Sequence, residues 1–203
     1  MKLYYAPGAC SLSDHIVLEW IGRPYEAIRV SREELKSPGY LKLNPAGAVP
    51  VLEDDGWVLT QNVAILNYLV DRFPESGLGG DGSAKSRAQV NQWLSLANAD
   101  IHPAFHPFFG STAYLEDPAL IESTKQAAAT KLRGLFARID HQLDGRDWLT
   151  GSRSIADAYL FVVTRWAKAM NVDLSGFDNL ARFFNAMLGD AGVQRALEQE
   201  GLT

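Results

Sequence analysis

The chain has 203 residues, of which 47% are hydrophobic and 21% are charged, and its formal net charge is −5. This composition excludes wholesale disorder, and the acidic balance argues against a broad surface for nucleic acid or an anionic membrane. The single cysteine excludes a disulfide within the chain. We expect a soluble, cytoplasmic protein, because the N-terminus lacks the apolar segment of a signal peptide and no stretch approaches the length of a membrane span.

Strand and helix patterns alternate in the first part of the chain. The helix pattern that follows the first short strand ends at Gly22, a residue type that commonly terminates helices. Asp54-Asp55-Gly56 separates two short apolar runs and predicts a hairpin. This alternation predicts a small α/β sheet with a mixed strand order, with strands at 3–5, 25–30, 49–52 and 57–59 and the longer helices at 11–21 and 62–73.

Beyond a glycine-rich stretch at 75–83, strand patterns nearly vanish and long helical patterns follow. Ser154 and Asp157 have the spacing of a capping box, whereas Pro103 lies inside an apparent helix that it should kink. We predict an α/β domain at 1–77, a linker at 78–86 and an all-helical (all-α) domain at 87–203. The predicted helices are 84–105, 118–143, 155–170, 179–188 and 193–200.

Cys10 is the first candidate for chemistry, because it lies between the first strand and the first helix. A thiol at a helix start faces unpaired backbone N–H groups and the positive end of the helix dipole, so we expect a pKa below the usual value of about 8.5. Without a second cysteine, Cys10 can form a disulfide only with an external thiol. The alternative interpretation is a buried, inert cysteine.

A proline opens the third predicted strand. If the Val49–Pro50 bond were cis, the N–H and C=O groups of Val49 could face Cys10 and pair with an extended peptide ligand. Only about 5–6% of X-Pro bonds in folded proteins are cis. The residues alone therefore favour an ordinary trans proline at a sheet edge.

Gln61 and Asn62 begin the helix that runs to residue 73. Backbone N–H groups at a helix N-terminus bind carboxylates, so this position could hold an anionic end of a ligand. The alternative is that Asn62 caps only its own helix, which is the commoner role of an asparagine at a helix start.

Together, these features resemble one family. The segments that carry the resemblance are 5–11 (YAPGACS), 44–50 (NPAGAVP), 61–65 (QNVAI), 154–157 (SIAD) and the tail from 193 to 202. In this order and spacing they are similar to cytosolic glutathione transferases, specifically those of the bacterial beta class. The resemblance covers essentially the whole chain.

This resemblance implies a thioredoxin-like N-terminal domain that binds glutathione, a helical C-terminal domain that forms the pocket for a second substrate, and a homodimer. It implies glutathione as substrate and no metal. The Cys10 sulfur would lie beside the glutathione sulfur, with Tyr5 and Ser11 near it. Glutathione itself would be held by Val49, Pro50, Gln61, Asn62, by Asp100 reaching across from the other subunit and, at the glycyl carboxylate, by Arg32 or Lys36.

The histidines follow the family pattern only in part. Beta-class transferases have a His-Lys pair that faces the thiol, and the histidine falls on His102 while Pro103 replaces the lysine. Ser95 replaces a family asparagine. His106 lies one helical turn beyond His102, so both could face the site. Histidine can exchange a proton near neutral pH and stabilise a thiolate; the alternative is two solvated or capping histidines.

Three functions remain open on this basis. The first is a detoxifying transferase that conjugates glutathione to a small hydrophobic electrophile, reduces disulfides through Cys10, or does both. The second is a non-catalytic carrier of glutathione or another ligand, because fold alone does not confer activity. The third is a glutathione-dependent dehalogenase or isomerase, since the helical domain sets the second substrate.

Overall fold

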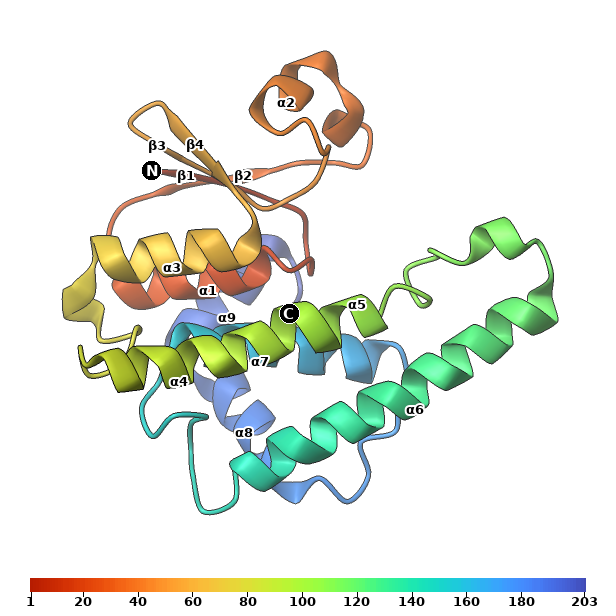
Figure 1. Ribbon diagram of the computed structural model, residues 1–203. Coiled ribbons are helices and arrows are strands. Elements are labelled where there is room, and N and C mark those ends of the chain that lie inside the picture. Colours follow the sequence, from red (N-terminus) through yellow and green to blue (C-terminus); the bar gives the residue numbers. More distant parts are fainter.

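A computed structural model describes residues 1–203, and its N-terminal part is built on a four-stranded sheet of order β2-β1-β3-β4 (Figure 1). The first two strands run parallel and the other pairings are antiparallel, with Leu3 opposite Leu52 in the centre of the sheet. The predicted mixed strand order is therefore confirmed. The strands are β1 (Lys2–Tyr5), β2 (Glu26–Arg29), β3 (Val51–Asp54) and β4 (Trp57–Thr60).

Helices cover both faces of this sheet. The long helices α1 (Leu12–Ile21) and α3 (Asn62–Arg72) lie on the face toward the helical part, and the short α2 (Pro38–Leu43) lies on the other side (Figure 1). Gly22 ends α1 in the left-handed conformation, with φ 69°, as predicted. This layering is the thioredoxin-like arrangement that the sequence predicted.

The second part of the chain is entirely helical. Its central element is α7, in which all but three residues are buried, and the long α6 projects beyond the other helices (Figure 1). No helix combines the length and hydrophobicity needed to cross a bilayer. The elements are α4 (Ala84–Ser95), η3 (Leu96–Ile101), α5 (His102–Ala104), α6 (Pro118–Gln142), α7 (Ile155–Ala169), α8 (Asp178–Gly189) and α9 (Ala191–Glu200).

The helix before Pro103 widens into a π-helix and does not show the predicted kink. Residues 96–101 form a π-helical stretch, and the His102 N–H donates to the carbonyl of Ala97, five residues earlier. Pro103 has no N–H to donate to the preceding turn, so the local change from four- to five-residue spacing absorbs the missing bond. The predicted helix 84–105 is thus three joined segments.

The two parts of the molecule share one apolar core. Helix α1 packs against α7 and α9 of the helical part as well as against α3. Residues at the start of α1 therefore lie at the junction of the two parts, with protein on several sides. The predicted domain limits, 1–77 and 87–203 with a linker at 78–86, stay a prediction.

The start of α7 is fixed by the capping box predicted from Ser154 and Asp157. The buried Asp157 carboxylate accepts hydrogen bonds from the N–H and Oγ of Ser154, at 2.8 and 2.7 Å, and from the N–H of Leu149 at 2.9 Å. Replacing it would leave three buried donors without an acceptor. Burial of unpaired polar groups is costly.

We therefore expect Asp157→Ala to lower the free energy of unfolding by about 3 kcal/mol, from the lost cap and the orphaned donors. Urea unfolding followed by circular dichroism measures this. The exposed Asp147 of the preceding loop provides the matched control, and Asp147→Ala should shift the midpoint very little. Equal shifts in the two variants would show that the box does not hold α7.

Candidate functional site

Cys10 lies in the tight turn that connects β1 to α1. Gly8 adopts φ 72° there, and the N–H of Ala9 closes the turn on the carbonyl of Ala6 at 3.0 Å. The Cys10 thiol points at the segment before β3, where its Sγ donates to the carbonyl of Val49 at 3.8 Å. The sulfur and the backbone of the Val49 segment therefore face each other.

The Val49–Pro50 bond is cis. The prediction of a trans bond, which the residues alone favoured, is therefore wrong. Pro50 is buried, while Val49 keeps partial exposure beside the thiol. The Val49 carbonyl acts as the acceptor for Cys10 in this structure.

The protonation of Cys10 differs from the prediction. Burial, with a smaller contribution from the carboxyl of Asp14, raises the pKa of the Cys10 thiol to about 12, although the N–H groups of Ser11 and Cys10 itself act in the opposite direction. The expectation of a lowered pKa is therefore wrong, because desolvation at the domain junction outweighs the helix N-terminus. At neutral pH the group is a thiol, consistent with its donation to Val49.

This protonation state makes a pH prediction. Only the thiolate reacts with an alkylating reagent, so alkylation of Cys10 by iodoacetamide should be slow at pH 7. Because the pKa is raised to about 12, the rate should rise about tenfold for each step of one in pH between pH 7 and 10, without a plateau. Intact-mass spectrometry measures this at a single site, since Cys10 is the one cysteine. A plateau below pH 8.5 would contradict the assignment.

Two residues predicted near the sulfur have their hydroxyl groups engaged elsewhere. Ser11 is buried, and its Oγ lies 3.3 Å from the N–H and 3.4 Å from the carbonyl of Ala6, so it braces the turn. Tyr5 is also buried, and its hydroxyl donates to the carbonyl of Gln199 at 3.2 Å. Ser11 therefore supports the turn that carries Cys10, Tyr5 links β1 to α9, and neither hydroxyl bonds to the sulfur.

The start of α3 divides into an exposed and a buried residue. Gln61 is exposed and adopts a left-handed φ of 75°, which is strained for a residue with a side chain. Asn62 is buried, and its side chain faces inward to Ser13, with the amide and the Oγ 3.1 Å apart. The Asn62 side chain thus binds α1, and only backbone N–H groups of α3 remain to meet a ligand carboxylate.

His102 is partly buried and packs against the aromatic side chains of α7. Its Nδ1 is 2.5 Å from the hydroxyl of Tyr159, and the centre of its ring lies 4.7 Å from the centre of the Trp166 ring. Burial, with a smaller contribution from His106, lowers the pKa of His102 to about 4. The predicted proton exchange near neutral pH is therefore wrong for His102, which is neutral there. His106 is exposed, with its ring 5.9 Å from that of His102.

Asp100 and Lys36 are both exposed, and no contact within this chain brings either of them to Cys10. Asp100 lies in the π-helical stretch η3, and Lys36 ends η1 (Glu34–Lys36) beside α2. Arg32 is exposed in the same region as Lys36. Their predicted roles at the ends of glutathione stay predictions.

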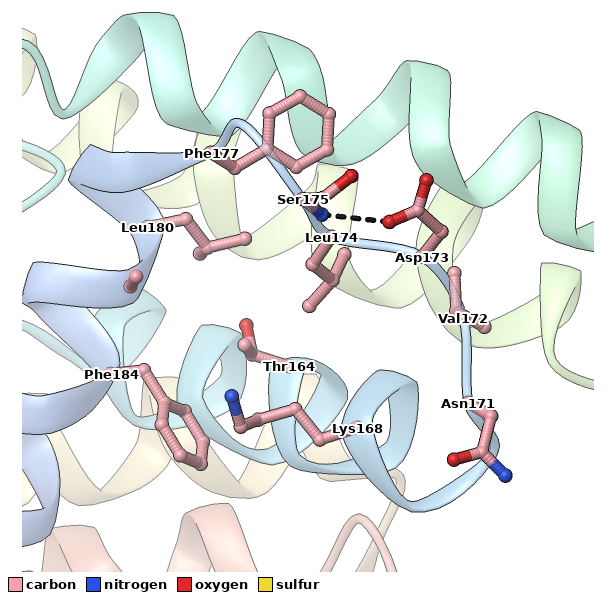
Figure 2. Close-up of a pocket in the computed structure, with 11 residues that line it drawn as sticks. Thr164, Lys168, Asn171, Val172, Asp173, Leu174, Ser175, Phe177, Leu180 and Phe184 are labelled. Carbon is pink, nitrogen blue, oxygen red and sulfur yellow. Dashed lines mark hydrogen bonds between the residues drawn. The ribbon is translucent and has the colours of Figure 1, made fainter.

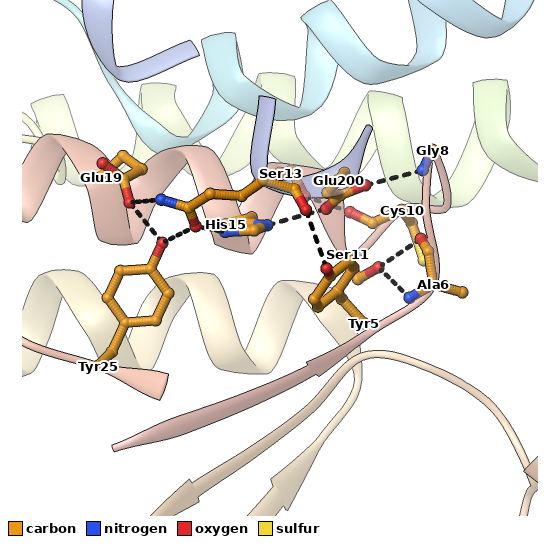
Figure 3. A network of polar contacts seen from close by, with 11 residues as sticks. Tyr5, Ala6, Gly8, Cys10, Ser11, Ser13, His15, Glu19, Tyr25 and Glu200 are labelled. Carbon is orange, nitrogen blue, oxygen red and sulfur yellow. Dashed lines mark hydrogen bonds and ion pairs between the residues drawn. The ribbon is translucent and has the colours of Figure 1, made fainter. Parts of the chain in front are cut away.

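Residues near the C-terminus also hold the Cys10 turn, which the sequence did not predict. The side chain of Glu200 accepts from the N–H of Gly8 at 2.8 Å and pairs with Nδ1 of the buried His15 at 3.0 Å (Figure 3). Trp166 donates its Nε1 to the carbonyl of Gly8 at 2.7 Å. Residues of α9 and α7 therefore bind both the N–H and the carbonyl of Gly8.

A cavity of about 540 Å³ opens between α7, α8 and the loop at 171–177, away from all of these residues (Figure 2). Its floor is apolar, including Leu180 and Phe184, and the Lys168 ammonium lies over the Phe184 ring. The buried Thr164 hydroxyl is satisfied by the carbonyl of Leu160. No buried side-chain polar atom that lines the cavity is left without a hydrogen-bond partner, and no group of three or more potential metal ligands occurs in the structure.

The arrangement around Cys10 thus combines a protonated thiol, the backbone of Val49 and the N-terminus of α3. These elements suit an extended peptide-like ligand that carries a carboxylate at one end and a sulfur near its middle. The thiol can donate a hydrogen bond to an anionic sulfur, and in its ionised form it can attack a disulfide.

Comparisons with known proteins agree with this geometry. The family descriptions "Glutathione S-transferase, N-terminal domain" and "Glutathione S-transferase, C-terminal domain" match residues 1–71 and 98–190. A Xanthomonas campestris protein named glutathione S-transferase GST-4.5 is 58% identical over the full length of both chains. The solved structure of a glutathione S-transferase from Xylella fastidiosa is 51% identical, with a TM-score of 0.98 over 100% of this chain and 99% of that one. A sphingomonad glutathione S-transferase solved with glutathione is 36% identical, with a TM-score of 0.87 over 100% of both chains.

Proposed function

The chain belongs to the glutathione S-transferase family, and from this premise we propose that it binds reduced glutathione beside Cys10 and transfers the glutathione sulfur to electrophiles. The family predicted from the motifs is confirmed. The single observation that carries the proposal is the thiol of Cys10 facing the Val49 backbone, 3.8 Å from its carbonyl, at the start of α1.

Three parts of the site would hold glutathione. The exposed edge at Val49 would pair with the cysteinyl backbone of the ligand, and the start of α3 at Gln61 and Asn62 would receive the γ-glutamyl carboxylate. The glycyl carboxylate would meet Arg32 or Lys36, which are both exposed. In this proposal the protein is a homodimer in which Asp100 reaches the γ-glutamyl ammonium of the partner's site, which suits its exposure.

The protonated Cys10 favours conjugation at neutral pH. In this reaction the glutathione thiolate attacks the electrophile, a carbon–sulfur bond forms and the leaving group departs with its electron pair. Cys10 donates its S–H to the glutathione thiolate and so lowers the pKa of the bound glutathione thiol. The neutral His102 and the Tyr159 hydroxyl, 2.5 Å apart, supply polar groups without charge on the helical side.

Disulfide exchange is the second reaction of the same site and requires the Cys10 thiolate. The thiolate attacks the glutathione sulfur of a mixed disulfide, forms a Cys10–glutathione disulfide and releases the other thiolate, which takes up a proton. A second glutathione thiolate then attacks the glutathione sulfur of the Cys10 disulfide, releases oxidised glutathione and restores Cys10. Because the pKa of Cys10 is raised to about 12, this reaction should accelerate with rising pH.

Such chemistry fits a cytoplasmic detoxifying enzyme that acts on small hydrophobic electrophiles or disulfides. Calorimetry with reduced glutathione, together with turnover of an aryl halide and of a glutathione mixed disulfide, tests the proposal. We expect saturable binding and turnover of the aryl halide at pH 7. Tight binding without turnover of either substrate would favour a ligand carrier, and the absence of binding would refute the proposal.

A further inference from the structure

A carboxyl group is buried without a cation next to Cys10. Asp14 is fully buried on the first turn of α1, four residues after Cys10, so the two side chains lie on the same face of the turn. None of the ion pairs in the structure includes Asp14. A buried carboxylate without a cation is expensive, so an Asp at this position calls for an explanation beyond packing.

Asp14 contacts the start of α3 through Asn62. With its amide nitrogen facing the carboxyl, Asn62 donates to Oδ2 of Asp14 over 2.6 Å and to Oδ1 over 3.3 Å. The Oγ of Ser13 lies 3.1 Å from the same amide and donates to the carbonyl of Cys10 at 2.7 Å. A short polar path therefore joins the Cys10 turn to the first residue of α3.

We propose that Asp14 is a positioning residue that ties the carboxylate-binding start of α3 to the Cys10 turn and controls when the Cys10 thiol ionises. This inference rests on the proposed function, in which α3 and Cys10 contact opposite ends of one glutathione molecule. It assigns to Asp14 no contact with the ligand.

The control over Cys10 follows from charge. Burial raises the pKa of Asp14 well above its usual range, and Glu200 raises it further; Asp14 in turn raises the pKa of Cys10. Two neighbouring anions, one of them fully buried and the other partly exposed, are unfavourable in a poorly solvated site, so this pair accommodates one negative charge more readily than two. Ionisation of Cys10 is thus favoured when Asp14 is protonated.

No lysine, arginine or histidine forms an ion pair with Asp14. The titratable groups that face the pair are Tyr159 of α7 and Glu200 of α9. Behind them lie His102, which bonds to Tyr159, and Tyr5 and His15, which lie beside Glu200. The one basic side chain beside the Cys10 turn is Arg165 of α7, which lies next to Gly8 and donates to the carbonyl of Leu202 at 3.2 Å. His102 is neutral at pH 7, and His15 is engaged with Glu200.

Two substitutions separate the two roles. Asp14→Asn removes the charge but keeps an acceptor for Asn62, so Cys10 should be alkylated by iodoacetamide at least about tenfold faster than in the wild type at pH 8, with an unchanged KM for glutathione. Asp14→Leu removes the acceptor as well and should also raise that KM, by about tenfold for the lost positioning. Glu19→Gln is the matched control, because Glu19 is on the same helix but pairs with Arg195; its alkylation profile should equal that of the wild type.

An Asp14→Asn alkylation profile identical to the wild type would overturn the control of ionisation, and an unchanged KM in Asp14→Leu would overturn the tie to α3. Should either variant fail to fold, the titration of the aspartate carboxyls in the wild-type protein can be followed instead, by carbon-13 NMR of protein with labelled aspartate. Two aspartate carboxyls, those of Asp14 and the buried Asp157, must then titrate well above all the others. If no aspartate carboxyl other than that of Asp157 titrated in a raised range, the control of Cys10 ionisation would be refuted. Alkylation needs no glutathione, so a wild type without turnover would refute the proposed function alone.

Discussion

Cys10→Ala should lose disulfide reduction and retain a reduced but measurable conjugating activity. We expect turnover of a glutathione mixed disulfide, corrected for the spontaneous reaction, to fall at least about a hundredfold, because the covalent intermediate requires a protein sulfur and the chain has no other cysteine. Conjugation of an aryl halide should fall only about tenfold, the usual cost of one hydrogen-bond donor to a charged group.

The comparison of the two substrates makes this prediction specific. Cys10→Ser is the matched control: its hydroxyl keeps a donor for the glutathione thiolate, so conjugation should recover while disulfide reduction stays lost. Both rates are measured at pH 7 and pH 8.5, since the wild-type exchange rate should rise with pH as the thiolate fraction rises. Full disulfide reduction by Cys10→Ala would refute exchange through this residue. Complete loss of conjugation would contradict a role of Cys10 in conjugation that is limited to donating a hydrogen bond.

Local signals in the sequence predicted the fold well. Gly22 ends α1 in the left-handed conformation, the Asp54-Asp55-Gly56 turn joins β3 to β4, and Asp157 caps α7. Each of these features depends on residues that are close in sequence, so the pattern contains the whole interaction. For the same reason, the helix limits fall within a few residues of those predicted.

The chemistry of the site was harder to predict, because it depends on burial. The helix start next to Cys10 is visible in the sequence and favours a thiolate, but the protein that encloses the thiol comes from distant segments. Tyr159 is 57 residues from its partner His102, and Glu200 is separated from Gly8 by 192 residues. Only Asp14, four residues after Cys10, could have been recognised as a neighbour from spacing alone.

The contact between Glu200 and the Gly8 turn leads to the second large prediction. The side chain of Glu200 is fully buried, and it is the acceptor for both the Gly8 N–H and the His15 ring. Glu200→Ala would leave both partners unpaired and a void at the junction of α1 and α9. Removing one partner of a buried polar pair typically costs about 3–5 kcal/mol, and we expect a loss of this size in the free energy of unfolding, measured in urea at pH 7.

The Glu200 prediction also has a functional readout, because the Gly8 peptide is adjacent to the loop of Cys10. With one side of the turn released and Trp166 alone holding the Gly8 carbonyl, solvent should reach the thiol and lower its pKa toward the ordinary value, so alkylation at pH 8 should accelerate. Glu198→Ala is the control, since Glu198 is exposed on the same helix, and Glu200→Gln should retain much of the stability through its remaining acceptor. If Glu200→Ala unfolds like Glu198→Ala, the C-terminal helix does not brace the turn, and the position of the sulfur must depend on α1 and Trp166 instead.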